Sequence, residues 1–379
     1  MNAKPSTPQP LPAGAADVLA ARPVSHWSAW RGVIDCYARY LPVSAATPVI
    51  TLQEGNTPLI RADNFVQSLG GHIELWLKYE AMNPTCSFKD RGMTVAISKA
   101  RERGAEVVIC ASTGNTSASA AAYAARAKMK CVVLLPHGKI ALGKLAQALM
   151  YGAVTISVQG NFDDALRIVR ELGETGQVEV VNSINPDRIE GQKTAAFEIC
   201  DQLERAPDFH FLPVGNAGNI TAYWKGFKEY YSVRKADRLP RIFGFQAAGA
   251  APIVEGHPIE HPNTVASAIR IGNPASWQGA NNALKESNGH IAKVTDDEIL
   301  AAYKLVARTE GIFAEPASAA PLAGLIKCLQ AGLIPEGSVI TATLTGHGLK
   351  DPDNAIKTAG FEPVVVEANK KAVMKVIGL

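Results

Sequence analysis

Residues 74–110, ELWLKYEAMNPTCSFKDRGMTVAISKARERGAEVVIC, decide the fold. They begin with an apolar run at 74–80 that predicts a strand. A polar loop follows, and then an amphipathic segment at 89–104 that predicts a helix closed by Gly104. A second apolar run at 106–110 predicts another strand. A strand, a helix and a second strand in this order form the unit of a parallel sheet that is covered by helices.

The same alternation continues to residue 247. Further strands are predicted at 131–136, 154–159, 178–182, 209–214 and 241–247, and further helices at 117–130, 142–151, 162–172, 189–204 and 217–233. This pattern predicts an α/β fold with doubly wound, mainly parallel sheets. The loops at the carboxyl ends of the strands are then where functional residues are expected.

Composition excludes several classes of protein. The chain has 379 residues, with 38 Lys and Arg against 35 Asp and Glu, a net charge of +3 that gives no indication of a nucleic-acid partner. Apolar residues make up 47% of the chain, which is ample for a core, and a chain of this length exceeds the size at which one core stops growing, so two lobes are expected. No run of 18 apolar residues occurs without charges or turn formers, so no membrane span and no membrane partner are expected.

The cysteines and the N-terminus indicate a cytoplasmic protein with reduced thiols. None of the six cysteines forms a CxxC pair, which argues against a zinc site or a redox dithiol. Cys110, Cys131 and Cys200 lie in apolar runs and are predicted to be buried. Residues 1–24 are rich in Pro and Ala and lack the pattern of a secretion signal, so we expect a flexible tail.

The loop at residues 83–93, NPTCSFKDRGM, places Lys89 at the start of a predicted helix. The helix dipole disfavours a positive charge there, which lowers the pKa of the lysine and favours a neutral, nucleophilic amine. Taken alone, the position is also compatible with an ordinary solvated lysine.

Two further loops are suited to anions. ASTGNTSAS (111–119) opens a predicted helix with free N–H groups, although its Ser, Thr and Asn residues are also common helix caps. GNAGN (215–219) has two glycines before another helix, which suits a phosphate group, and a plain glycine turn is the alternative. It lacks the spacing of the dinucleotide-binding fingerprint.

Two competing motifs are weak. GKIALGK (138–144) has the spacing of a phosphate-binding loop of nucleotide hydrolases, but Leu145 stands where Ser or Thr would bind magnesium. His257 and His261 have the spacing of a zinc-binding helix, but each is followed by proline, which indicates a loop. No metal site is predicted.

The motifs together resemble the threonine synthase family, pyridoxal-phosphate enzymes of the tryptophan-synthase-β fold type (fold type II). The resemblance covers most of the chain, and SFKDRGM with STGNTSAS is its most specific part. It rests on EGNTPLI (54–60), NPTCSFKDRGM (83–93), STGNTSAS (112–119), GKIALGKLAQALMYGA (138–153), VNSINPDRIEGQKT (181–194), GNAGN (215–219), GFQAAGAAPIV (244–254), AIRIGNPASWQGA (268–280), EPASAA (315–320) and TGHGLKDP (345–352).

The resemblance implies roles for individual residues. Lys89 matches the lysine that binds pyridoxal phosphate as a Schiff base, Asn115 the residue that binds the ring O3′, and Thr345 the hydroxyl at the pyridine nitrogen. The cofactor phosphate would be bound by Gly215, Asn216, Ala217, Gly218 and Asn219. The residues expected near the substrate are Ser112, Thr113 and Thr116, and those expected at its phosphate are Lys144, Asn182, Ser183 and Arg188.

The implied reaction converts O-phosphohomoserine and water into threonine and phosphate. A synthase that uses O-phosphoserine, like cysteate synthase, would keep the same cofactor residues and remains an alternative, because one methylene gives about 1–3 kcal/mol of discrimination. Threonine dehydratase, a non-catalytic relative and a nucleotide hydrolase are less favoured. Cys86 departs from the family, which usually has Gly at this position, and would be strained if its φ were positive.

The resemblance also implies a division into domains. A smaller mobile domain at 85–185 would be inserted in a large cofactor-binding domain formed by 25–84 and 186–379. A homodimer is expected from the family, with a small molecule as the substrate.

Overall fold

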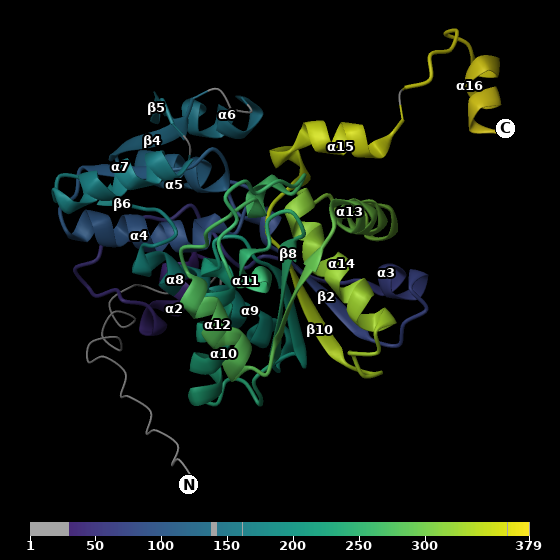
Figure 1. Cartoon of the computed structure of the whole chain (residues 1–379), viewed down its shortest axis with the longest axis horizontal. Coiled ribbons are helices and arrows are strands. Elements are labelled where there is room, and N and C mark those ends of the chain that lie inside the picture. Colours follow the sequence, from purple (N-terminus) through teal and green to yellow (C-terminus); the bar gives the residue numbers. More distant parts are fainter. Residues whose placement is uncertain (1–29, 138–141, 161, 362, 379) are drawn as a thin grey trace.

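The computed structural model describes residues 30–137, 142–160, 162–361 and 363–378 (Figure 1). The predicted tail at 1–24 lies outside these ranges. The described chain forms two sheets with helices around them, and the expected α/β class is confirmed. The strand pairs of both sheets are parallel except β1 with β2.

The larger sheet has six strands within the described residues. Their order is β1 (Leu59–Arg61), β2 (Glu74–Tyr79), β10 (Val339–Leu344), β7 (Phe209–Pro213), β8 (Arg241–Ala247) and β9 (His290–Val294). Because β2, β10 and β7 are neighbours and parallel, the three loops that leave their carboxyl ends lie along one edge. Those loops carry Lys89, Thr345 and residues 215–219.

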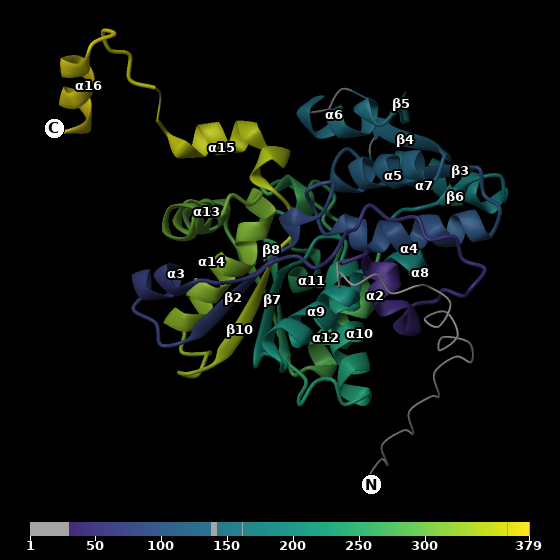
Figure 2. The same cartoon turned by 180° about the vertical axis from the view of Figure 1, so that it is seen from behind.

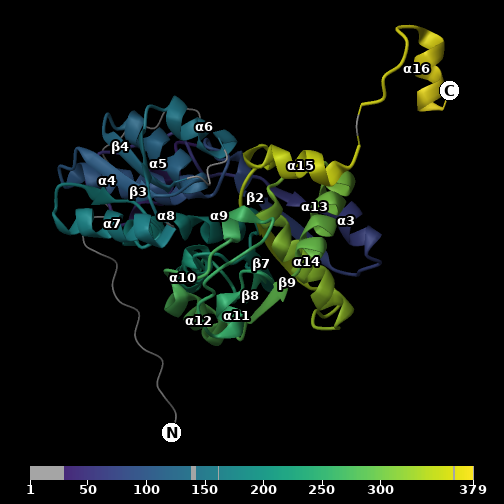
Figure 3. The same ribbon diagram turned by 45° about the horizontal axis from the view of Figure 1, so that its top comes forward.

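Helices cover both faces of this sheet. Successive side chains of a strand point to opposite faces, so Phe243 and Phe245 pack into one core and Ile242 into the other. One layer contains α3 (Asp63–Ser68), α13 (Asp296–Glu310) and α14 (Pro316–Gln330), and the other contains α2 (Val33–Tyr37), α9 (Thr194–Leu203), α10 (Gly218–Ser232) and α12 (Trp277–Glu286). Figure 3 shows α13 and α14 on the side opposite α10 and α12.

The smaller sheet has four strands within the described residues, in the order β5 (Val154–Val158), β4 (Lys130–Pro136), β3 (Val107–Ala111) and β6 (Glu179–Val180). Its helices are α4 (Lys89–Glu102), α5 (Asn115–Arg126), α6 (Leu142–Met150) and α7 (Phe162–Glu174). Figure 2 shows this group at one end of the molecule, beside the larger sheet.

Shorter elements complete the described chain. They are η1 (Ala38–Tyr40), η2 (Glu80–Met82), α8 (Pro186–Gln192), α11 (Pro252–Glu255), η3 (Ser267–Ile269), η4 (Gly348–Lys350), α15 (Pro352–Ala359) and α16 (Lys370–Ile377). In Figures 1 and 2, α16 stands apart from the body of the molecule, and none of its residues is buried. None of the described helices has both the length and the apolar character needed to cross a membrane.

Three predicted elements have different bounds. The helix predicted at 189–204 is two helices, α8 and α9, which meet where the Thr194 hydroxyl donates to the Gly191 carbonyl at 2.7 Å and competes with the helical pattern. The strand predicted at 178–182 is shortened to β6, because the side chain of Asn182 takes the place of backbone pairing with β3. The helix predicted at 117–130 ends at Arg126, since Lys128 has a φ of 56°.

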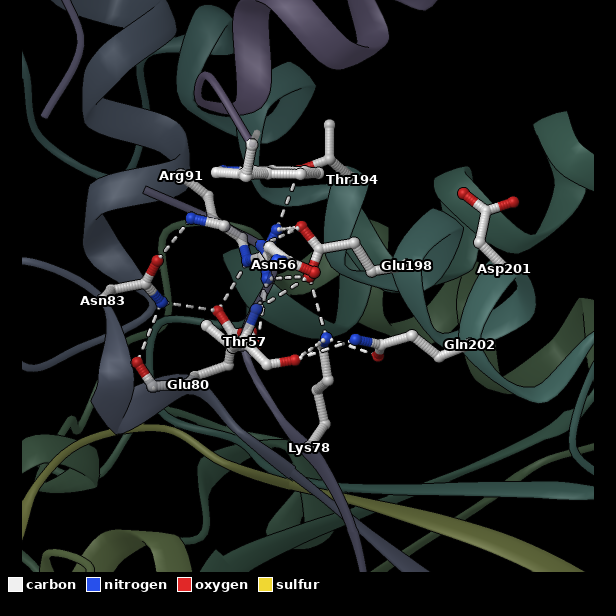
Figure 4. Close-up of polar contacts among 12 residues, drawn as sticks. Asn56, Thr57, Lys78, Glu80, Asn83, Arg91, Thr194, Glu198, Asp201 and Gln202 are labelled. Carbon is white, nitrogen blue, oxygen red and sulfur yellow. Dashed lines mark hydrogen bonds and ion pairs between the residues drawn. The ribbon is translucent and has the colours of Figure 1, made fainter. Parts of the chain in front are cut away.

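Four buried charged side chains connect the two sheets (Figure 4). Arg91, on α4, forms ion pairs of 2.6 Å with Glu80, which follows β2, and with Glu198 on α9. Lys78 on β2 pairs with Glu198 at 2.8 Å. Burial raises the pKa of Glu198, but Arg91 and Lys78 outweigh this effect and hold the pKa at about 2. The network therefore has two positive and two negative groups that compensate one another.

Replacing Glu198 by Ala is expected to lower the free energy of unfolding by about 3–5 kcal/mol, because Arg91 and Lys78 would each lose a partner while remaining buried. Urea unfolding followed by circular dichroism measures the loss. The matched control is Glu171→Ala, which breaks an exposed pair with Arg167 and should cost at most about 1 kcal/mol. Equal effects of the two substitutions would contradict a structural role for the network.

Candidate active site

The loop before α4 fixes the place of Lys89. The carboxylate of Asp90 accepts hydrogen bonds from the backbone N–H and the hydroxyl of Thr85, both at 2.6 Å, and from the Ser119 hydroxyl at 2.5 Å. The N–H of Phe88 donates to the Thr345 carbonyl at 3.0 Å. Lys89 is the first residue of α4, as predicted, and its loop is bound to both α5 and the segment after β10.

Burial, and to a smaller extent the charge of Arg188, lower the pKa of Lys89 to about 7, although the carboxylate of Glu315 opposes both effects. The predicted direction of the shift is therefore confirmed, but burial and not the helix dipole is its largest cause. The Lys89 Nζ lies 4.1 Å from the centre of the Phe88 ring. Within the described residues it has no hydrogen bond or ion pair. A large share of this amine is consequently neutral near pH 7.

Asn115 and Thr345 come together at one carboxylate that the sequence did not single out. The Nδ2 of Asn115 lies 3.2 and 3.1 Å from the two carboxylate oxygens of Glu315, and the Thr345 hydroxyl donates to the same group at 3.2 Å. Glu315 is 4% exposed. Its motif, EPASAA, was part of the resemblance but gave it no role, and only its position before a helix could have drawn attention to it.

Residues 215–219 form a turn with unpaired polar atoms. Ala217 has a φ of 62° and precedes α10, so the first N–H groups of that helix are at the turn. Both polar atoms of the buried Asn219 side chain are without a partner in the described chain. A Cβ on Gly215 would lie 3.1 Å from the Cα of Ile269, so there is little room for a larger residue. Backbone donors at a helix N-terminus and an unpaired amide suit the phosphate that this turn was predicted to bind.

Arg188 is fully buried beside α4. Its Nη1 donates to the Val181 carbonyl at 3.1 Å, but its Nε and Nη2 have no partner among the described residues. Burial lowers the pKa of Arg188 to about 10, so the side chain is still positively charged at neutral pH. A buried guanidinium with unused donors is typical of a binding site for an anion.

The other predicted substrate residues lie after β3, after β6 and on α6. Ser112 and Thr113 are half-buried between β3 and α5, and Thr116 is half-buried in the first turn of α5. The Asn182 amide is bound to both the N–H and the carbonyl of Ala111 at 3.0 Å, which leaves one N–H for another acceptor, and Ser183 follows it half-buried. Lys144 lies on α6, but its side chain is outside the described part of the chain.

Of the two competing motifs, only the histidine pair lies wholly in the described chain. Residues 138–141 of the GKIALGK motif lie outside the described ranges. No cluster of three or more His, Cys, Asp or Glu side chains suited to a metal occurs in the part of the chain that the structure describes, which includes His257 and His261. The cysteines predicted to be buried, Cys110, Cys131 and Cys200, are buried thiols.

Comparison with known proteins finds a matching family and relatives that agree with one another in name. The family described as pyridoxal-phosphate dependent enzyme matches residues 50–346. The chain is 57% identical to a threonine synthase of Synechocystis sp. over 94% of this chain and 92% of the relative. It is 60% identical to a threonine synthase of Bacillus sp. (strain ULM1), over 87% and 93% of the two chains.

Solved structures share the fold at low sequence identity. Maize serine racemase matches with a TM-score of 0.69 and 20% identity over 80% of this chain and 92% of that one. Processed threonine deaminase isoform 2 of Solanum lycopersicum matches with a TM-score of 0.68 and 24% identity, over 80% and 88% of the two chains. At these identities the likeness shows the fold alone, and fold type II is thereby confirmed.

Cys86, in the Lys89 loop, has a φ of 63°. This is the positive φ at which a cysteine was expected to be strained. Cys86→Gly should leave the free energy of unfolding unchanged or raise it by up to about 1 kcal/mol, because glycine relieves strain but adds chain entropy. Cys36→Gly, inside α2, is the matched control and should lose about 1 kcal/mol. Urea unfolding measures both. A larger loss for Cys86→Gly than for Cys36→Gly would contradict strain at Cys86.

Proposed function

The chain belongs to the pyridoxal-phosphate dependent enzymes and, within them, to the threonine synthase family, and we propose that the reaction takes place at Lys89. It is a lyase with threonine synthase function, and its cofactor is pyridoxal phosphate. The substrate is a small molecule, which we propose to be O-phosphohomoserine. The buried guanidinium of Arg188, with two unpaired nitrogens in the described structure, carries the proposal of a phosphorylated substrate.

The residues around Lys89 fit the cofactor. The amine of Lys89 is available as a nucleophile near pH 7, and the unpaired amide of Asn219 with the N-terminus of α10 suits the cofactor phosphate. We propose that Lys89 binds the cofactor, with Asn115 and Thr345 at its ring and Gly215–Asn219 at its phosphate. When bound, pyridoxal phosphate supplies an electron sink that makes a proton on the substrate's Cα acidic.

The chain's own groups then bind the substrate and move protons. The Lys89 amine takes the proton from Cα, which its pKa of about 7 permits at neutral pH. A second proton leaves Cβ as the bond from Cγ to the phosphate oxygen breaks, and Cγ then gains a proton. Water adds its hydroxyl at Cβ, its remaining proton goes to the released phosphate, and Cα regains a proton, which gives threonine and phosphate. Arg188 stabilises the leaving phosphate by charge. Lys144, Asn182 and Ser183 bind the same phosphate.

The substrate's carboxylate requires a separate site. Ser112, Thr113 and Thr116 are half-buried beside the start of α5, where hydroxyl groups and backbone N–H groups are available to it. We propose that these residues bind the substrate, while Arg188 and its neighbours bind the phosphate. An O-phosphoserine-using synthase remains the second candidate, because its substrate carries the same two anionic groups one methylene closer together.

We propose further that residues 85–185 move as a smaller domain against 25–84 and 186–379, closing over the substrate and excluding water. The smaller sheet is built entirely from the first range, and the larger sheet from the other two.

Six unpaired cysteines are consistent with the reducing cytoplasm, in which we propose that the enzyme works. We propose that it works there as a homodimer.

The proposed reaction predicts that the purified protein with pyridoxal phosphate releases threonine and phosphate in equal amounts from O-phosphohomoserine. Lys89→Ala should abolish both products and the visible absorbance of the bound cofactor, because the amine is lost. Arg101→Ala, on the same helix, is the matched control and should retain both. A yellow protein that instead consumed only O-phosphoserine would refute the substrate, and turnover by Lys89→Ala would refute the residue.

Arg188→Met, which keeps most of the side-chain volume but removes the charge, should raise KM for O-phosphohomoserine about 10- to 150-fold, the effect of losing hydrogen bonds to a charged group. The amount of bound pyridoxal phosphate should stay the same. Steady-state kinetics and cofactor absorbance measure the two effects, with exposed Arg167→Met as the control. Unchanged KM would exclude Arg188 from the phosphate site.

A further inference from the structure

Glu315 is a buried carboxylate at the meeting point of several residues in the proposed site. It accepts hydrogen bonds from Asn115 and Thr345, and the Ser318 hydroxyl lies 3.0 Å from the Thr345 hydroxyl. Asn115 belongs to the smaller sheet's side of the site, whereas Glu315 and Thr345 belong to the larger sheet's side. The carboxylate therefore connects residues from both sides.

Structural needs alone do not explain a glutamate here. Glu315 is the N-cap of α14, yet its side chain makes no capping hydrogen bond, and Ser, Thr, Asp or Asn would be a better cap. Its neighbour Gly346 leaves room for it, because a Cβ there would lie 2.5 Å from Glu315 Oε1. The N-terminus of α14 also favours a negative charge at this place. The carboxylate of Glu315 therefore binds residues of the site and does not cap α14.

The hydrogen bonds of Glu315 decide how Asn115 is oriented. An amide nitrogen has two N–H groups, and Asn115 Nδ2 donates toward Glu315. A carboxylate only accepts, so the amide cannot turn its oxygen toward Glu315. The second N–H of the same nitrogen is left for another acceptor, such as the anionic ring O3′ that Asn115 is proposed to bind. Without Glu315, either end of the amide could face the ring.

Glu315 also acts on Lys89 by charge. The charged groups that act on this amine are Arg188 from α8 and Glu315 at the N-cap of α14, while Asp90 on α4 and Lys350 in η4 are the next charged groups of the site. Of the two carboxylates, Asp90 is occupied by Thr85 and Ser119, and Glu315 is the one that raises the pKa of Lys89. It also opposes the lowering of the pKa of Lys350 by burial.

We propose that Glu315 is a positioning residue of the reaction, whose carboxylate orients Asn115 and Thr345 toward the cofactor ring and places a negative charge in the site around Lys89. This inference deepens the proposed function and rests on it, because it takes Lys89 as the residue that binds the cofactor. Neither the motifs nor the family resemblance gave Glu315 a role.

Glu315→Gln in the cofactor-loaded enzyme tests the proposal, since it keeps the size of the side chain but removes its charge. The visible absorbance of bound pyridoxal phosphate is titrated with pH. Removal of a negative charge disfavours the protonated form, so the midpoint should move about 1 unit or more toward lower pH. Glu336→Gln, an exposed carboxylate after α14, is the matched control and should titrate like the wild type.

Kinetics and a second variant separate positioning from simple stability. Glu315→Gln should lower kcat about tenfold or more with little change in KM, because its amide can rotate and no longer fixes Asn115. Glu315→Asp keeps the charge, so its midpoint should stay near that of the wild type while kcat falls. The Glu315→Asp variant also tests the proposal if Glu315→Gln does not fold.

Glu315→Gln with the wild-type midpoint and kcat would overturn the proposal, and so would Glu315→Asp with the wild-type kcat if Glu315→Gln does not fold. The absorbance titration needs no substrate. A wild-type protein that binds pyridoxal phosphate but makes no threonine would therefore contradict the proposed function alone, and the titration would still decide the role of Glu315.

Discussion

The buried ion pairs of Arg91 with Glu80 and Glu198 are the constraint on which the rest of the structure depends. They join α4, the end of β2 and α9, which come from distant parts of the chain (Figure 4). Arg91 is two residues after Lys89 on the first turn of α4, so fixing its guanidinium also fixes the helix turn from which the lysine projects. A bidentate guanidinium constrains direction as well as distance, which a single ammonium would not.

The compensated charges of this network contrast with the uncompensated groups nearby. Arg91 and Lys78 have carboxylate partners, whereas Arg188 and Asn219 are buried with polar atoms that lack partners in the described residues. Unpaired buried donors do not stabilise a fold, because each has lost its hydrogen bonds to water without gaining a partner in the protein. The first set therefore stabilises the fold, and the second is the cost of a site ready to bind anions.

Much of the fold followed from the sequence, because its signals are local. Apolar runs and helix periodicity predicted the four strands of the smaller sheet and β2, β7 and β8 of the larger one, and the helix start at Lys89 was correct to the residue. The strands β1, β9 and β10 were not predicted. The break between α8 and α9 was missed, since it depends on a hydroxyl that competes with the backbone. The partners of Arg91 and the contacts of Glu315 were also missed. Glu198 is 107 residues from Arg91, and Asn115 is 200 from Glu315, so no local pattern relates them.

The three adjacent charges of the KDR sequence show how one helix turn serves three separate needs. Successive side chains of an α-helix point about 100° apart, so neighbours cannot share a partner. Lys89 faces the proposed site, Asp90 binds Thr85 and Ser119, and Arg91 enters the buried network. Asp90 thereby holds the strained loop at Cys86, while Arg91 holds the helix. The lysine between loop and helix needs no partner of its own to be fixed, and its amine stays free for chemistry.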